Sequence, residues 1–123
     1  GMNIFIAEDA PVVRERLIAL IEELGGMTVV GHSASVADSV GQIARLQPEI
    51  ALLDVRLSDG TAFDIIARLK AMALSIRTIL ISADGSAHYR ARAAQLGVLH
   101  FFDKTREFEL IGPALIRLGG GVR

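Results

Sequence analysis

Cysteine and tryptophan are absent from this 123-residue sequence, and its 13 basic residues nearly balance its 14 acidic ones. Without cysteine, the chain has no disulfide, no thiolate metal site and no cysteine nucleophile. The formal net charge of -1 gives no basic field for nucleic acid. No apolar run is long enough to span a bilayer, and the N-terminus lacks the layout of a signal peptide. We therefore expect a soluble cytoplasmic protein that contacts neither nucleic acid nor a membrane directly.

The residues that are present favour a compact fold. Hydrophobic residues make up 51% of the sequence and charged residues 22%, a balance that is typical of a folded domain rather than a disordered chain. A chain of this length usually forms one domain. We expect a single domain over residues 1–123, with its core within 2–118 and a glycine-rich tail at 119–123.

Short apolar runs alternate five times with segments of helical periodicity. The expected strands are residues 2–7, 27–32, 50–54, 77–81 and 98–102. An amphipathic helix is expected after each strand, and Gly112-Pro113 predicts a kink or a late start in the last helix. This alternation predicts an α/β fold, a doubly wound parallel sheet of five strands with helices on both faces.

Four of the expected strands end at polar residues, which are Glu8-Asp9, Asp54, Ser82 and Lys104. In a parallel sheet these ends share one edge, where ligands bind. Clustered carboxylates repel one another unless something neutralises them, and their hard oxygen atoms suit Mg²⁺. A lysine and a hydroxyl are donors for phosphoryl oxygens. Because a carboxylate can act as a covalent nucleophile, the pattern indicates phosphoryl transfer to an aspartate.

From Asn3 to about Leu118 the chain resembles the receiver domains of response regulators in two-component signalling. The resemblance rests on Glu8-Asp9, Asp54, the Asp59-Gly60 turn, Ser82, Lys104 and Phe101, which falls on an aromatic switch position. The segments 8–11 and 54–57 look closest to receivers that usually carry helix-turn-helix outputs. The resemblance implies a flavodoxin-like fold with strand order 2-1-3-4-5.

The resemblance also implies the site. A sensor histidine kinase or phosphotransfer protein would donate a phosphoryl group to Asp54, and the chain would not be a turnover enzyme. Mg²⁺ would be held by Asp9, Asp54 and the backbone carbonyl of Arg56. Glu8 would bind the ion through water or directly, and Lys104 would contact a phosphoryl oxygen.

A switch is implied as well. Ser82 would swing toward the phosphoryl group, and Phe101 would turn inward into the space released. The surface of the fourth helix, fifth strand and fifth helix would then change. A homodimer could form through the same surface, to which Tyr89, Arg90 and Arg92 contribute a polar helix face.

Three residues depart from the pattern of the family. Glu8 replaces the more usual Asp, which shifts the acid by one methylene. Ser58 replaces the usual Pro before the Asp-Gly turn, and we expect a looser loop there. Thr105 replaces the usual Pro after Lys104, and we expect a trans peptide bond between Lys104 and Thr105.

Simpler interpretations exist for several of these residues. Glu8 could merely lie at the positive end of the first helix, and Ser82 could be the N-cap of the fourth helix. Phe101 and Phe102 must point to opposite faces of their strand, and we expect Phe102 in the core. Asp103 is expected to be a solvated loop residue.

Other functions remain open. A phosphatase or phosphotransferase with an aspartate nucleophile generally needs a second acid two residues later, where this chain has Arg56. A flavin- or nucleotide-binding protein would need a phosphate-binding loop after the first strand, where this chain is acidic. A pseudo-receiver, an interaction module that is never phosphorylated, is the remaining alternative.

Overall fold

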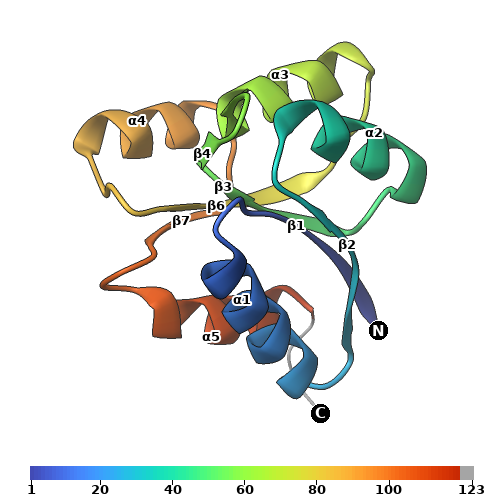
Figure 1. The fold of residues 1–123 in the computed structure, drawn as a ribbon, viewed down its shortest axis with the longest axis vertical. Coiled ribbons are helices and arrows are strands. Elements are labelled where there is room, and N and C mark those ends of the chain that lie inside the picture. The colour runs from blue at the N-terminus through green and yellow to red at the C-terminus, as the bar shows by residue number, and fades with distance from the viewer. Residues whose placement is uncertain (120–123) are drawn as a thin grey trace.

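A computed structural model describes residues 1–119, and its five-stranded sheet lies between two layers of helices (Figure 1). The strands of the sheet are β1 (Met2–Ala7), β2 (Met27–Ser33), β3 (Ile50–Asp54), β6 (Arg77–Ser82) and β7 (His100–Asp103). The helices are α1 (Pro11–Glu23), α2 (Val36–Leu46), α3 (Ala62–Ala71), α4 (Ala87–Gln95) and α5 (Ile111–Leu118). Helices α1 and α5 cover one face, and α2, α3 and α4 cover the other.

All neighbouring strands in the sheet run parallel, in the order β2-β1-β3-β6-β7. The two further strands, β4 (Arg56–Leu57) and β5 (Gly60–Thr61), form a small antiparallel hairpin outside the sheet. Counting only the strands of the main sheet, the order is 2-1-3-4-5, which confirms the expected topology. Asp54 pairs in register with Ile81, so β3 and β6 end at the same edge.

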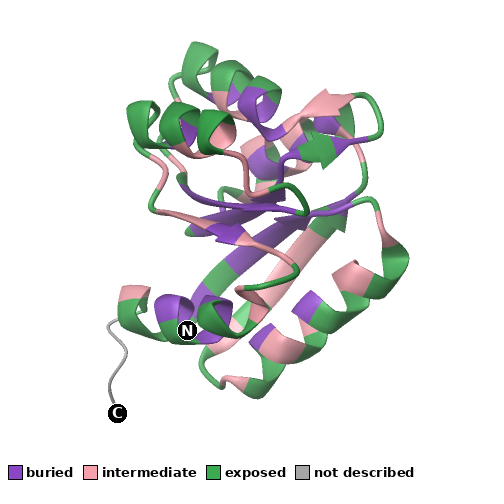
Figure 2. Cartoon of the chain, turned by 90° about the vertical axis from the view of Figure 1, so that its left-hand side faces the viewer, coloured by how far each residue is buried: buried purple, intermediate pink, exposed green. Residues whose placement is uncertain are grey.

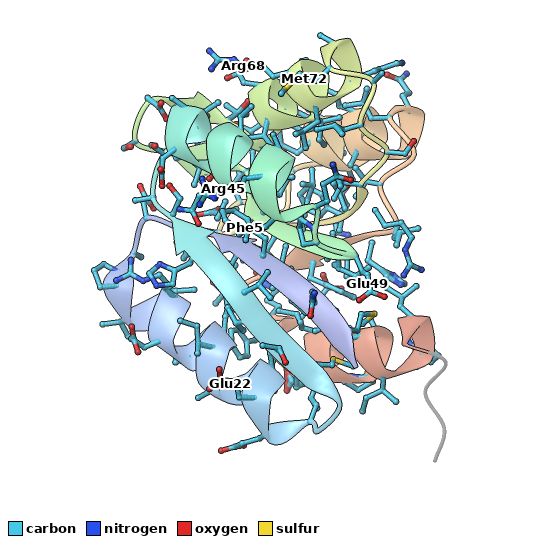
Figure 3. All side chains as sticks on the ribbon, turned by 90° about the vertical axis from the view of Figure 1, so that its right-hand side faces the viewer. Phe5, Glu22, Arg45, Glu49, Arg68 and Met72 are labelled. Carbon is cyan, nitrogen blue, oxygen red and sulfur yellow. The ribbon has the colours of Figure 1, made fainter. Side chains whose placement is uncertain are left out.

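The apolar residues divide into two cores because successive side chains of a strand point to opposite faces. In β3, Ala51 and Leu53 pack toward α2 and α3, whereas Ile50 and Leu52 pack toward α1 and α5. Every residue of β3 is buried, and the sheet is the most buried layer of the molecule (Figure 2). On the outside, Glu22 and Arg68 mark the two opposite helical layers (Figure 3). None of the helices within residues 1–119 is long and apolar enough to cross a membrane.

The last helix begins late, as Gly112-Pro113 predicted. A 3-10 turn, η1 (Phe108–Leu110), precedes it, and α5 starts at Ile111. Proline is tolerated in the first turn of a helix because the backbone N–H groups there have no partner within the helix. The tail expected at 119–123 falls outside the described residues from 120 onward, so its extent stays a prediction.

Two expectations about the end of the fifth strand are wrong. The fifth strand is β7, not 98–102, and Asp103 is its last residue, paired in register with Ser82. The carboxylate of Asp103 also accepts hydrogen bonds from the N–H groups of Thr105 and Arg106. The looser loop expected at Ser58 stays a prediction; the backbone N–H and the hydroxyl of Ser58 both donate to the carbonyl of Ala34.

Candidate functional site

The edge where the strands end brings together Glu8, Asp54 and Lys104. The Nζ of Lys104 lies 3.0 Å from Oδ2 of Asp54 and 3.0 Å from Oε1 of Glu8, so one ammonium donates to two carboxylates. Glu8 has an exposed fraction of 0% and Asp54 of 5%. Buried carboxylates require a partner, and Lys104 supplies it for both.

The polypeptide around β1 fixes the position of Glu8. Its backbone N–H donates to the carbonyl of Ser33, and its Oε2 accepts the N–H of Ala10 at 3.0 Å. Pro11 begins α1 directly afterwards, so Glu8 precedes the helix and lies within the site. Glu8 thus lies next to the helix N-terminus, as the simpler interpretation expected, and it also contacts Lys104.

Burial and the neighbouring charges shift the pKa values of Glu8 and Lys104. Burial raises the pKa of Glu8 from its ordinary value of 4.5 to about 7, and the nearby charge of Asp54 adds to the rise. Burial alone would lower the pKa of Lys104, but the hydrogen bonds and charges of Asp54 and Glu8 outweigh it and raise that pKa. Lys104 therefore stays charged at neutral pH, and the site carries a fixed positive group beside Asp54.

Asp9 completes a group of acids that could hold a metal ion. Oxygen atoms of Glu8, Asp9 and Asp54 all lie within 4.8 Å of one another. Asp9 is exposed, so its carboxylate faces solvent beside the two buried acids. A hard oxygen set of this kind fits Mg²⁺, which binds through one or two carboxylates together with water. Arg56, whose backbone carbonyl was predicted as a ligand, lies two residues beyond Asp54 in β4.

Ser82 lies at the same edge but its hydroxyl is engaged elsewhere. Its Oγ donates to the carbonyl of Asp84 at 2.7 Å and accepts the N–H of Asp84 at 3.0 Å. Ser82 is not the N-cap of α4. That position belongs to Ser86, whose side chain accepts the N–H of Tyr89. Ser82 is therefore the buried last residue of β6, and its hydroxyl is bound to the backbone of Asp84 in the loop that leads to α4.

The two phenylalanines of β7 separate as expected. Phe102 is buried with an exposed fraction of 8% and belongs to the core beneath α1 and α5. Phe101 is half-buried and packs against the opposite core. The guanidinium of Arg90 lies over the Phe101 ring at 4.8 Å from its centroid. In this structure Phe101 thus lies between the core and an arginine of α4.

Comparison with known proteins decides the family. The family model described as the response regulator receiver domain matches residues 4–115. The chain belongs to this family. The acid cluster and Lys104 lie within the matched residues.

Individual relatives agree with this assignment. The receiver is 27% identical over 118 residues to the acid tolerance regulatory protein ActR of Rhizobium meliloti, covering 96% of this chain and 60% of ActR. It is 29% identical over 117 residues to the transcriptional regulatory protein CitB of Klebsiella pneumoniae, covering 95% of this chain and 50% of CitB. The chain spans about half the length of the curated relatives it matches.

Solved structures show the same fold. The signal receiver domain of NarL from Mycobacterium tuberculosis superposes with a TM-score of 0.87 at 26% identity, covering 98% of each chain. The isolated receiver domain of RcsB from Salmonella enterica serovar Typhimurium also gives a TM-score of 0.87, at 19% identity, with coverage of 100% of this chain and 91% of that one. At 19% identity, the similarity to RcsB shows only that the two domains share a fold.

Sequence reasoning missed the contacts that hold the loops of this receiver. The carboxylate of Asp59 accepts the N–H groups of Val36 and Ala37, so it caps α2 from a distant loop. Arg90 and Arg92 were expected as an open polar face, but each lies over an aromatic ring of this chain. A local sequence pattern reveals neither arrangement. Asp59 lies outside α2, and the two aromatic rings lie outside α4.

Proposed function

We propose that this chain is a phosphorylation-switched receiver in which Asp54 accepts a phosphoryl group. The observation that supports the proposal most strongly is the contact of buried Asp54 with Lys104, beside a group of acids that could hold Mg²⁺. In a member of the receiver family, this arrangement combines a nucleophile, a fixed positive charge and a candidate metal site.

Residues of this chain would hold the metal. Asp9 and Asp54 would be carboxylate ligands, the backbone carbonyl of Arg56 a third, and Glu8 would act through water or directly. Bound Mg²⁺ would neutralise carboxylate and phosphoryl oxygens. Glu8 already accepts from Lys104 and from Ala10, which favours the role of an indirect ligand.

The donor would be a phosphohistidine of a sensor kinase or of a phosphotransfer protein. An oxygen of Asp54 would form a bond to phosphorus while the bond from phosphorus to the imidazole nitrogen breaks. The electron pair of that bond stays with the imidazole, which then takes a proton. Lys104 would contact a phosphoryl oxygen and balance the added negative charge.

The switch would start from the contacts seen here. To reach a phosphoryl group, Ser82 would give up its hydrogen bonds to Asp84, and Phe101 would leave the guanidinium of Arg90. These changes would alter the surface of α4, β7 and α5, through which kinases, outputs or a second copy could dock. The relatives are about twice as long as this chain, and its sequence pattern most resembles that of receivers whose output is a helix-turn-helix domain.

One observation favours the pseudo-receiver as a second candidate. The carboxylate of Glu8 is fully buried and accepts hydrogen bonds from both Lys104 and Ala10, so Lys104 is shared before any ligand arrives. A chain locked in this arrangement would act by binding partners, without taking up phosphate. Neither candidate is a turnover enzyme, since Arg56 occupies the position of the second acid.

Incubation with acetyl phosphate, with and without Mg²⁺, separates the two candidates. Intact-mass spectrometry should show one phosphoryl group on the protein, formed only when Mg²⁺ is present. Failure to label with acetyl phosphate and with a phosphorylated histidine kinase, while the protein stays folded, would favour the pseudo-receiver.

A further inference from the structure

Arg90 reaches from α4 to the segment that carries Lys104. Its Nη1 donates to the carbonyl of Phe101 at 3.2 Å, and its Nη2 donates to Oε1 of Glu107 at 2.9 Å. The same guanidinium lies over the Phe101 ring. One side chain thus makes three contacts with β7 and with the turn that follows it.

Glu107 extends these contacts to the residues on both sides of Lys104. The oxygen that accepts from Arg90 also accepts the N–H of Asp103 at 2.9 Å, and the N–H of Glu107 donates to the Asp103 carbonyl at 2.8 Å. The Asp103 carboxylate in turn accepts the N–H groups of Thr105 and Arg106, at 2.7 and 3.0 Å. A continuous network therefore runs from α4 to both flanks of Lys104.

Few side chains of α4 pack into the core, with Tyr89 partly buried against it, and the polar contacts of Arg90 add to this packing. Ala93 is the only residue of α4 that is buried. Arg92, on the same helix, lies over the Phe63 ring at 4.3 Å. Within the described residues Arg92 donates no hydrogen bond to β7 or to residues 103–107, so it is a matched control for Arg90.

We propose that Arg90 and Glu107 are positioning residues that hold Lys104 against Asp54. The inference rests on the proposed function, because it assigns them a part in phosphoryl transfer. An exposed ion pair alone contributes little to stability, and the side chains of Arg90 and Glu107 are 40% and 33% exposed. Here, however, the pair is joined to a stacked ring and to three backbone groups. The network restricts the positions open to Lys104, and a charge acts best on a reacting group when it is already in place.

The test compares Arg90→Gln, Glu107→Gln and the control Arg92→Gln in the full chain. Amide hydrogen exchange is measured at Asp103 without phosphate, and the rate of Asp54 labelling is measured with acetyl phosphate and Mg²⁺. Arg90→Gln should speed exchange at Asp103 and slow labelling, each by about fivefold, since a charged hydrogen bond to a partly exposed group is lost. Glu107→Gln should change both rates in the same directions, and Arg92→Gln should change neither rate by more than about twofold.

Equal exchange at Asp103 in Arg90→Gln and Arg92→Gln would overturn the proposal. Faster exchange with unchanged labelling would also overturn it, because the network would then be merely structural. Failure of the proposed function would be seen differently, as a wild-type protein that no donor labels. Suppose that the wild type is not labelled but exchange at Asp103 still differs between Arg90→Gln and Arg92→Gln. The role of Arg90 and Glu107 in phosphoryl transfer would then be overturned, and their role in anchoring residues 103–107 would be supported.

Discussion

The Nζ of Lys104 lies 3.0 Å from Oδ2 of Asp54, and the same ammonium contacts the fully buried carboxylate of Glu8. One charge therefore balances two acids that come from different strands. Because breaking a buried ion pair leaves the remaining charge without compensation, the stability of the fold depends on Lys104.

Replacing Lys104 by Met should therefore destabilise the protein in a pH-dependent way. At pH 8 the loss of unfolding free energy should be about 3 kcal/mol, since two buried acids would face each other without a cation. At pH 5 the loss should be smaller, because Glu8 then takes up a proton. Urea unfolding at both values measures the difference, with Lys70→Met on the exposed side of α3 as the control. An equal loss at both pH values would contradict the prediction.

Glu8 should make metal-free stability fall as the pH rises. The pKa of Glu8 is about 7 in the folded protein and 4.5 ordinarily, so the folded state holds a proton more tightly. Its contribution is complete below pH 4.5 and is lost as the pH rises through 7, by up to about 3 kcal/mol.

The measurement is urea unfolding from pH 4.5 to 8, with chelator present, on the wild type and Glu8→Gln. The wild type should lose stability relative to Glu8→Gln across this window, because Gln does not titrate. Parallel curves for the two proteins would show that Glu8 is not the group responsible.

Asp59 should stabilise the start of α2 although it lies 23 residues away in sequence. Its carboxylate accepts the N–H groups of Val36 and Ala37, which the helix itself leaves without partners. Asp59→Ala should lower the urea midpoint and speed amide exchange at both residues. Asp59→Asn keeps one acceptor oxygen, so its urea midpoint and its exchange rates should lie between those of the wild type and those of Asp59→Ala. If all three proteins exchange alike, the cap contributes nothing in solution.

Ser86 rather than Ser82 should control the start of α4. Ser86→Ala should cost about 1 kcal/mol and should speed exchange of the Tyr89 amide, which loses its acceptor. Ser82→Ala should leave the Tyr89 amide unchanged, since the hydroxyl of Ser82 bonds only to Asp84 among the described residues. Faster exchange at Tyr89 in Ser82→Ala would return the capping role to Ser82.

The sequence was sufficient to predict the sheet and the edge where the acids meet, because both follow from local patterns. The apolar run 50–54 ends at Asp54, and parallel pairing then brings Glu8 and Lys104 to the same edge. The contacts of Asp59 and Arg90 could not be predicted in this way. Their partners are backbone groups or rings on other elements, and only the packed structure determines which of these lie within reach.

The position of Asp103 shows a similar limit. Strand ends depend on how far the neighbouring strand can pair, and β6 extends to Ser82, so β7 continues to Asp103. The contacts of Ser58 also could not be predicted, since the absence of the usual proline suggested only a looser loop. The hydrogen bonds of Ser58 to Ala34 restrain the loop in a different way.

The most direct test of the account is to locate the phosphoryl group. The wild type, Asp54→Asn and Asp59→Asn are incubated with acetyl phosphate and Mg²⁺, and the modified residue is mapped by peptide mass spectrometry. Asp59 is a suitable control because it is a nearby acid, in the turn between β4 and β5, and its carboxylate is bound to the start of α2. We predict one phosphoryl group on Asp54 in the wild type and in Asp59→Asn, and none in Asp54→Asn. A phosphoryl group on any other residue, or undiminished labelling of Asp54→Asn, would contradict the central claim.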